Sequence, residues 1–101
     1  MSEVYKALAD PTRRRILQLL REREMSAGEI ADHFDLAKPT LSGHFAVLKA
    51  ADLVATEKQG TTITYRLNVS VLEEALMALM DGFGLIGGKS APATTQKGRA
   101  S

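Results

Sequence analysis

The chain has 101 residues, of which 45% are hydrophobic and 5% aromatic, so it has room for one compact core and none for a second. It contains no cysteine, which excludes disulfides, thiolate metal sites and cysteine nucleophiles. Because its formal net charge is only +1, any nucleic-acid surface has to come from local clusters of basic side chains.

The start of the chain and its apolar segments give no sign of a membrane protein. Residues 1–6 lack the basic-then-apolar pattern of a signal peptide. No apolar run approaches the roughly 20 residues needed to span a bilayer. We therefore expect a cytoplasmic protein without a membrane partner.

Two helices are predicted at the start of the chain. The first has about two turns, carries Val4, Tyr5 and Leu8 on one face, and ends before Pro11. Asp10 then fits the N-cap of a second helix, with Pro11 in its first position. This helix runs to about Arg23, and its buried face consists of Ile16, Leu17, Leu19 and Leu20.

A helix-turn-helix is predicted next. A serine–glutamate capping box over residues 26–29 starts a third helix that ends near Phe34. After a tight connection of three or four residues, a fourth helix covers residues 38–51, with Pro39 in its first turn. Its inward stripe consists of Leu41, Phe45 and Leu48. Two short helices joined in this way are typical of DNA-binding proteins.

A β-hairpin, or wing, is predicted after the fourth helix. Residues 53–58 and 62–67 are rich in β-branched side chains and flank a turn containing Gly60. In the second segment the apolar residues alternate with Thr62, Thr64 and Arg66, so one face is expected to pack on the helices while the other stays in water. The inward residues are Ile63, Tyr65 and Leu67.

The last predicted helix, over residues 69–85, has an unusually wide apolar arc. Residues 87–101 are small or polar without periodicity, and we expect them to be disordered. The predicted fold is mainly α with a small β-hairpin. It consists of one winged helix-turn-helix domain over residues 1–85 and a disordered tail over residues 86–101.

Three motifs resemble the arsenical-resistance-repressor (ArsR) family of bacterial regulators. They are Asp-Pro-Thr-Arg-Arg-Arg-Ile-Leu from position 10, Lys-Pro-Thr-Leu-Ser-Gly-His-Phe from position 38 and Leu-Lys-Ala-Ala-Asp-Leu-Val from position 48. The resemblance extends from Val4 to about Phe83, and its first motif is most similar to the metal-independent autorepressor branch. It implies a homodimer joined through the first and last helices, with each fourth helix in a major groove and each wing near the DNA backbone or minor groove.

The wide apolar arc of the last helix independently supports a dimer, because it needs more cover than a core of about 80 residues offers. The first helix is available to join it. The predicted dimer interface consists of Val4, Tyr5, Leu8, Leu72, Leu76, Leu79, Met80 and Phe83.

The DNA contacts are expected on the outward side of the fourth helix and on the wing. Lys38 and Ser42 are the best candidates for base edges, whereas Thr40 and the free N–H groups of the first turn suit a phosphate. Arg66 is the strongest phosphate candidate of the wing. The full predicted set is Lys38, Thr40, Ser42, Gly43, His44, Lys58, Gln59, Thr61, Thr62 and Arg66.

Some of these residues have a structural alternative. Gly43 stands where many members of the family carry a large polar residue, and it either permits close approach of DNA or is a tolerated surface glycine. His44 either contacts DNA or is a hydrogen-bonded residue at the core edge. The wing could be merely solvated. Residues 13–15 are all arginine, cannot all face one phosphate strand, and are alternatively solvated or paired with Asp10 or Glu22.

No metal site or cofactor is expected. Metal-sensing members of the family place a Cys-x-Cys pair at the third helix, where this chain has Ser26 and Gly28. Another family site uses histidines and carboxylates of the last helix, and residues 69–85 contain no histidine. We therefore predict no metal ligand and no metal inducer.

The predicted function is transcriptional regulation. The expected partners are double-stranded DNA and a second copy of the chain, which together would form a homodimeric repressor on an inverted repeat in a promoter. The alternative is a winged-helix protein-interaction module, which the near-neutral charge favours. An enzyme is not expected, because no nucleophile–base pair, phosphate loop or carboxylate dyad occurs at usable spacing.

Overall fold

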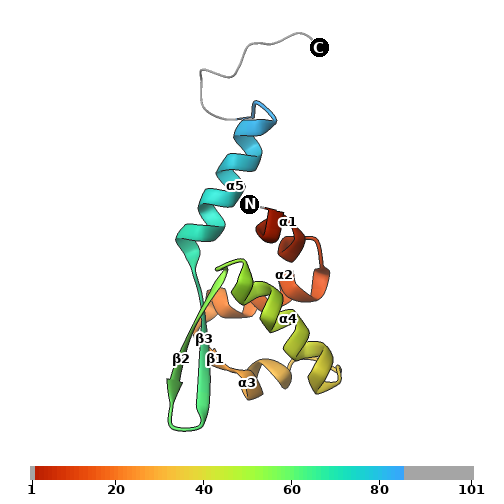
Figure 1. Ribbon diagram of the computed structural model, residues 1–101, viewed down its shortest axis with the longest axis vertical. Helices are drawn as coiled ribbons and strands as arrows, with labels where there is room; N and C mark the ends of the chain where they lie inside the picture. The colour runs from red at the N-terminus through yellow and green to blue at the C-terminus, as the bar shows by residue number, and fades with distance from the viewer. Residues whose placement is uncertain (1, 86–101) are drawn as a thin grey trace. The chain divides into compact units, whose positions relative to one another are not determined.

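The computed structural model describes residues 2–85, so the predicted tail lies outside the described residues. The chain divides between Val71 and Leu72 into two compact units. The elements, shown in Figure 1, are α1 (Ser2–Leu8), α2 (Pro11–Glu22), β1 (Met25–Ser26), α3 (Ala27–Ala31), α4 (Lys38–Ala50), β2 (Val54–Gln59), β3 (Thr62–Leu67) and α5 (Val69–Gly82).

The core of the first unit lies between its helices and a small sheet. Helices α1, α2 and α4 pack against one another, while α2 and α3 pack on β3. The largest fully buried side chains come from α2, α3, α4 and the turn after α4, and they are Ile16, Ile30, Leu48 and Leu53. Among the described residues no polar or charged residue is buried, so this core is held by apolar contact.

Both predicted N-caps are confirmed. The Asp10 carboxylate accepts hydrogen bonds from the backbone N–H groups of Thr12 (2.8 Å) and Arg13 (3.1 Å) at the start of α2. The Ser26 hydroxyl accepts from the Glu29 N–H at 3.1 Å, and the Glu29 carboxylate accepts from the Ser26 N–H at 2.8 Å. These bonds satisfy backbone donors that a helix start leaves without partners.

The sheet contains one strand more than the sequence predicted. Its order is β1-β3-β2, with both pairs antiparallel. Strand β1 pairs Met25 with Tyr65 and Ser26 with Thr64. A strand of two residues has no alternation of its own to detect, because only its pairing with β3 defines it.

Two predicted helix ends were too late. Helix α3 ends at Ala31 and not near Phe34, because the N–H groups of His33 and Phe34 donate to carbonyls three residues back and tighten the chain into a turn. Residues 32–37 therefore connect α3 to α4, a longer connection than predicted. Helix α5 ends at Gly82 and not at Leu85, because Gly84 adopts a positive φ of 73°.

The hairpin is set by two residues with positive φ. Helix α4 ends in a Schellman motif: the Asp52 N–H donates to the Lys49 carbonyl and the Leu53 N–H to the Leu48 carbonyl, with Asp52 at a φ of 59°. Strand β2 then begins at Val54, one residue later than predicted. Gly60, at a φ of 64°, turns the chain so that Gln59 pairs with Thr62.

The predicted inward face of β3 is only partly inward. Tyr65 and Leu67 are half-buried, but Ile63 is 41% exposed, so its predicted burial was wrong. Ile63 pairs with Lys58 near the loop end of the hairpin, which Figure 1 shows extending beyond α3. The helices do not reach this end of the wing.

Helix α5 exposes most of its apolar side chains. Ala75 is its one buried residue among those described. Its exposed large hydrophobic residues are Val69, Leu76, Met77, Leu79 and Met80. After the helix, Phe83 is 71% exposed and Leu85 is 69% exposed. Even so, no helix within residues 2–85 is long and apolar enough to cross a bilayer.

Candidate nucleic-acid interface

Helix α4 has one buried side and one exposed side, as predicted. Leu41, Phe45 and Leu48 are buried. The exposed side consists of Pro39, Thr40, Ser42, Gly43 and Ala46, with Lys38 exposed at the start of the helix. Val47 is half-buried, because together with His44 and Ala51 it forms a row at helical spacing along the edge of the buried stripe.

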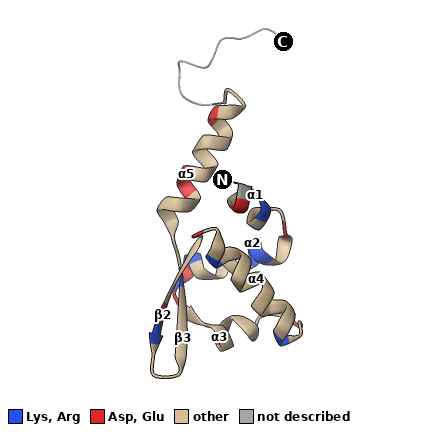
Figure 2. Cartoon of the chain, viewed as in Figure 1, with Lys and Arg blue, Asp and Glu red and all other residues tan. Residues whose placement is uncertain are grey.

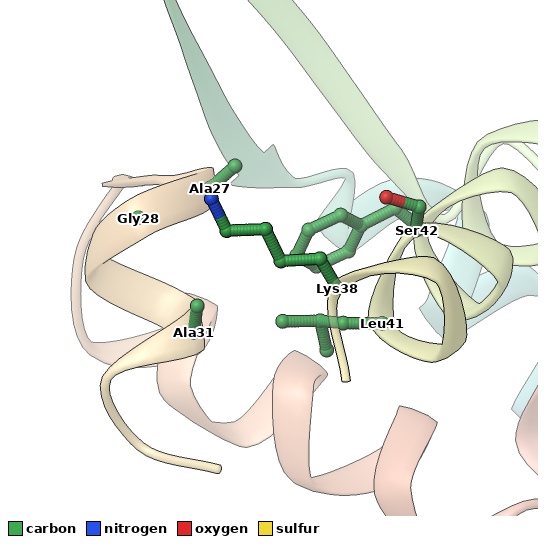
Figure 3. Close-up of a pocket in the computed structure, with 7 residues that line it drawn as sticks. Ala27, Gly28, Ala31, Lys38, Leu41 and Ser42 are labelled. Atoms are coloured by element: carbon green, nitrogen blue, oxygen red, sulfur yellow. The ribbon is translucent and has the colours of Figure 1, made fainter. Parts of the chain in front are cut away.

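The exposed side of α4 contains two hollows with Ser42 between them. One, of about 260 Å³, lies between α3 and α4, and Figure 3 shows the Lys38 side chain extending across it towards Ala27. The other, of about 190 Å³, is lined by Ser42, Ala46, Lys49 and Tyr65, among others, and so faces the wing. Ser42 therefore borders both hollows, one of which is also lined by Lys38 and the other by Lys49.

Lys49 is a candidate contact that the sequence analysis missed. It is exposed, lines the hollow between α4 and the wing, and lies two helical turns from Ser42. Its spacing of seven residues from Ser42 places both on one side of the helix, which is the signal that could have identified it. With Lys38 at the other end, α4 carries a cation at each end of its exposed side.

The start of α4 leaves backbone donors available. Ala37 occupies the N-cap position and makes no side-chain capping hydrogen bond. The N–H groups of a helix start lack partners within the helix and carry a partial positive charge. Thr40, which is exposed in this first turn, adds a hydroxyl to them.

The predicted wing residues are all exposed, but they lie on both faces of the hairpin. Directly paired residues share a face, so Lys58 shares the face of Ile63 and Tyr65, whereas Arg66 shares the other with Ala55. Lys58 therefore lies on the face through which Tyr65 contacts α4. The other predicted donors, Gln59, Thr61 and Thr62, surround the loop.

Within the described residues, basic and acidic positions both occur on several elements, as the colours of Figure 2 show. Residues 13–15, the three consecutive arginines, do not pair with Asp10 or Glu22. Arg14 donates to the Leu8 carbonyl at 2.8 Å and Arg15 to the Gln18 amide oxygen at 3.3 Å. The ion pairs that formed part of the structural alternative do not occur among the described residues: Asp10 caps α2, and Glu22 lies 3.6 Å from Arg21.

Arg13 makes the most contacts of the three. Its Nε donates to the Ala7 carbonyl and its Nη2 to the Lys6 carbonyl, each at 2.9 Å, and its Nη1 lies 3.1 Å from His44 Nδ1. The last carbonyls of α1 have no N–H donor within the helix, which explains why a guanidinium binds there.

The pKa shifts around the site follow from hydrogen bonding and burial. The Arg13 backbone N–H is the main cause that lowers the pKa of Asp10, and the Thr12 backbone N–H and the Arg13 charge act in the same direction. The Ser26 N–H similarly lowers the pKa of Glu29, and burial raises the pKa of Tyr65.

Two curated proteins are similar to most of the chain. The transcriptional repressor SdpR of Bacillus subtilis is 45% identical over 76 residues, which are 75% of this chain and 84% of SdpR. The arsenical resistance operon repressor of Staphylococcus aureus is 37% identical over 79 residues, which are 78% of this chain and 76% of that repressor. A helix-turn-helix domain model matches residues 8–57.

This chain belongs to the ArsR family of winged-helix transcriptional regulators. The solved structure of another ArsR family regulator matches with a TM-score of 0.76 and 30% identity, covering 83% of this chain and 92% of the other. HlyU of Vibrio cholerae matches with a TM-score of 0.67 and 30% identity, covering 82% of this chain and 90% of HlyU. The predicted fold and family are thereby confirmed, and the chain is a DNA-binding regulator and not an enzyme.

Ser26 and Gly28 stand at the positions that the family resemblance associates with metal sensing. Ser26 uses its hydroxyl in the capping box, and Gly28 has no side chain. Within residues 2–85, no group of three or more His, Asp or Glu side chains is arranged to hold a metal ion.

The residues predicted for the dimer interface differ in exposure. In α1, Val4 is buried, Leu8 is half-buried and Tyr5 is exposed. Of the α5 residues, Leu72 is half-buried, while the rest are exposed, namely Leu76, Leu79, Met80 and the adjacent Phe83.

Proposed function

We propose that the chain is a homodimeric repressor that binds an inverted repeat in a promoter and responds to no metal. The observation that carries this proposal is the exposed side of α4. It combines Lys38, Ser42 and Lys49 on a helix whose opposite side is fixed in the core. The two similar proteins are named as repressors, which supports repression and not activation of transcription.

In this proposal α4 enters the major groove and the wing contacts the backbone. Ser42 and Lys38 reach base edges, because both are exposed and border the hollow between α3 and α4. Thr40 and the first-turn N–H groups bind a phosphate, as helix starts do. On the wing, Lys58 lies on the face that contacts α4, and Gln59, Thr61, Thr62 and Arg66 add donors for the backbone.

A second copy is the proposed cover for α5. Its exposed apolar residues include Leu76 at 43% and Met77 at 57%. A contiguous apolar surface of this kind is typical of an interface, and a symmetric dimer buries the same surface of both copies. A dimer would also present two α4 helices to two half-sites about one helical turn apart.

A gel-shift titration tests the proposed function. The full chain is titrated against duplexes from the region upstream of its own gene and against a random duplex of equal length, at physiological salt. We expect binding to one upstream duplex that is on the order of 1,000-fold tighter than to the random duplex. Equal affinity for all duplexes would contradict the repressor proposal.

A further inference from the structure

Arg13 connects three elements of the first unit. It lies on α2, its Nε and Nη2 donate to the Ala7 and Lys6 carbonyls at the end of α1, and its Nη1 lies 3.1 Å from His44 Nδ1 on α4. Both carbonyl bonds measure 2.9 Å, so two separate nitrogens anchor the guanidinium before it reaches the histidine. The third nitrogen is thereby held at a fixed position beside the imidazole.

The chemistry of this contact determines the form of the imidazole. A guanidinium has five N–H donors and no acceptor, so His44 Nδ1 must be the acceptor. An imidazole that accepts at Nδ1 is neutral and carries its proton on Nε2. The contact with Arg13 therefore selects the Nε2–H tautomer of His44.

The position of His44 makes that tautomer relevant to DNA. His44 is half-buried at the edge of the exposed side of α4, next to the exposed residues Ser42 and Gly43. Its Nδ1 is occupied by Arg13, which leaves Nε2–H as the free polar group of the ring. The Arg13 guanidinium faces this histidine, while the Asp10 carboxylate is engaged by two backbone N–H groups of α2.

We propose that Arg13 is a positioning residue for DNA recognition: it holds His44 as the Nε2–H tautomer, so that α4 presents one fixed donor to an acceptor atom of DNA. This inference rests on the proposed function, since it requires α4 to face DNA. Arg13 itself acts through His44 and not through its charge. Lysine would keep that charge but could not bond two carbonyls and an imidazole from a planar fork.

The tautomer is measured first, without DNA. Nitrogen NMR of the full chain at about pH 8.5, where free imidazole is neutral, distinguishes Nε2–H from Nδ1–H. We expect His44 to be nearly all Nε2–H in the native protein and a mixture in Arg13→Lys. The other histidine, exposed His33, serves as an internal reference. Arg14→Lys is the control, because Arg14 binds the Leu8 carbonyl and not His44.

DNA affinity is measured next on the preferred upstream duplex. Arg13→Lys and His44→Ala are each expected to weaken binding about five- to tenfold, the size of one lost hydrogen bond. The double variant should be no weaker than His44→Ala, because both changes remove the same contact. Arg14→Lys should bind like the native protein. Circular dichroism spectra and urea midpoints verify that every variant is folded.

The outcomes separate this inference from the proposed function. A native protein with mixed His44 tautomers, or losses of affinity that add up in the double variant, would overturn the role of Arg13. A native protein with no preferred duplex would overturn the proposed function and the DNA role of His44 together. In that case the NMR experiment still shows whether the Arg13 contact itself exists.

Discussion

Phe45 on α4 and Tyr65 on β3 lie with their ring centroids 4.7 Å apart and their planes inclined by 31°. Phe45 belongs to the buried stripe of α4, and Tyr65 is half-buried at the base of the wing. A tilted aromatic pair at this distance is stabilising beyond its buried area. The pair therefore fixes the wing to the helix that carries the proposed base contacts.

Replacing Tyr65 should release the wing. We expect Tyr65→Ala to lower the free energy of unfolding by about 1–3 kcal/mol, since it removes a half-buried ring and the aromatic pair. Tyr65→Phe keeps the ring and should cost far less. Urea denaturation measures both, and equal losses for the two variants would mean that the hydroxyl and not the ring is important.

Replacing Asp52 with glycine should stabilise the fold. It adopts a φ of 59° in the turn that ends α4, a conformation that glycine tolerates better than any other residue. We expect Asp52→Gly to raise the free energy of unfolding by about 1 kcal/mol and Asp52→Ala to lower it. The measurement is the denaturant midpoint at unchanged slope. A lower midpoint for Asp52→Gly would contradict the prediction.

Gly43→Ala should stabilise α4. Apart from the adjacent residues and the local helix backbone, a Cβ at this position would have no atom within 4 Å, and glycine weakens a helix interior by about 0.5–1 kcal/mol relative to alanine. We expect a gain of this size in thermal or urea unfolding. Titration of the same variant with DNA decides between the two interpretations of this glycine, because only a closely approaching duplex would be hindered by the added methyl group.

The capping carboxylate of Asp10 should make the free energy of unfolding depend on pH in the acidic range. Hydrogen bonding to the Arg13 N–H lowers the pKa of Asp10 below its ordinary value of 3.8, so its contribution is complete above that value and is lost as the pH falls through the lower folded-state pKa. Asp10→Asn keeps an acceptor but no charge. The urea midpoint of the native protein should exceed that of Asp10→Asn at pH 7, and the difference should shrink steadily as the pH falls below 3.8. A constant difference would refute this assignment.

A charge on α5 should dissociate the proposed dimer. Leu76 is 43% exposed, and Leu76→Glu would place an unpaired carboxylate in the interface. We expect sedimentation to show a dimer for the native chain and a monomer for the variant. Glu73→Gln, an exposed change on the same helix, should stay dimeric. A native monomer would contradict the dimer proposal itself.

Local chemistry made much of the fold predictable from sequence. The caps at Asp10 and Ser26 depend on residues two or three positions away, so a short sequence pattern contains all the partners. The buried stripe of α4, at Leu41, Phe45 and Leu48, depends only on helical spacing.

Contacts between distant residues were not predictable in this way. The partners of Arg13 are a neighbouring helix end and His44, which is 31 residues away. Strand β1 is defined by the pairing of Met25 with Tyr65, and Ile63 is exposed because the end of the wing extends beyond the helices. Each depends on tertiary arrangement, for which a single sequence has no periodic signal.

For the candidate site, the sequence predicted which residues are exposed but not how they are grouped. Helical spacing placed Ser42 on the outward side of α4. Only the strand register shows that Lys58 and Arg66 lie on opposite faces of the wing. The contact between Phe45 and Tyr65 then shows which face meets α4.

The empty space around Gly43 also bears on how such a regulator could acquire a new target. A side chain added there meets no other part of the protein within 4 Å of its first carbon, so the fold imposes little selection on what occupies the position. If α4 binds DNA as proposed, single substitutions at residue 43 change the surface presented to the operator without compensating changes elsewhere in the fold. This makes the position a natural starting point for divergence between duplicated copies and for retargeting by design.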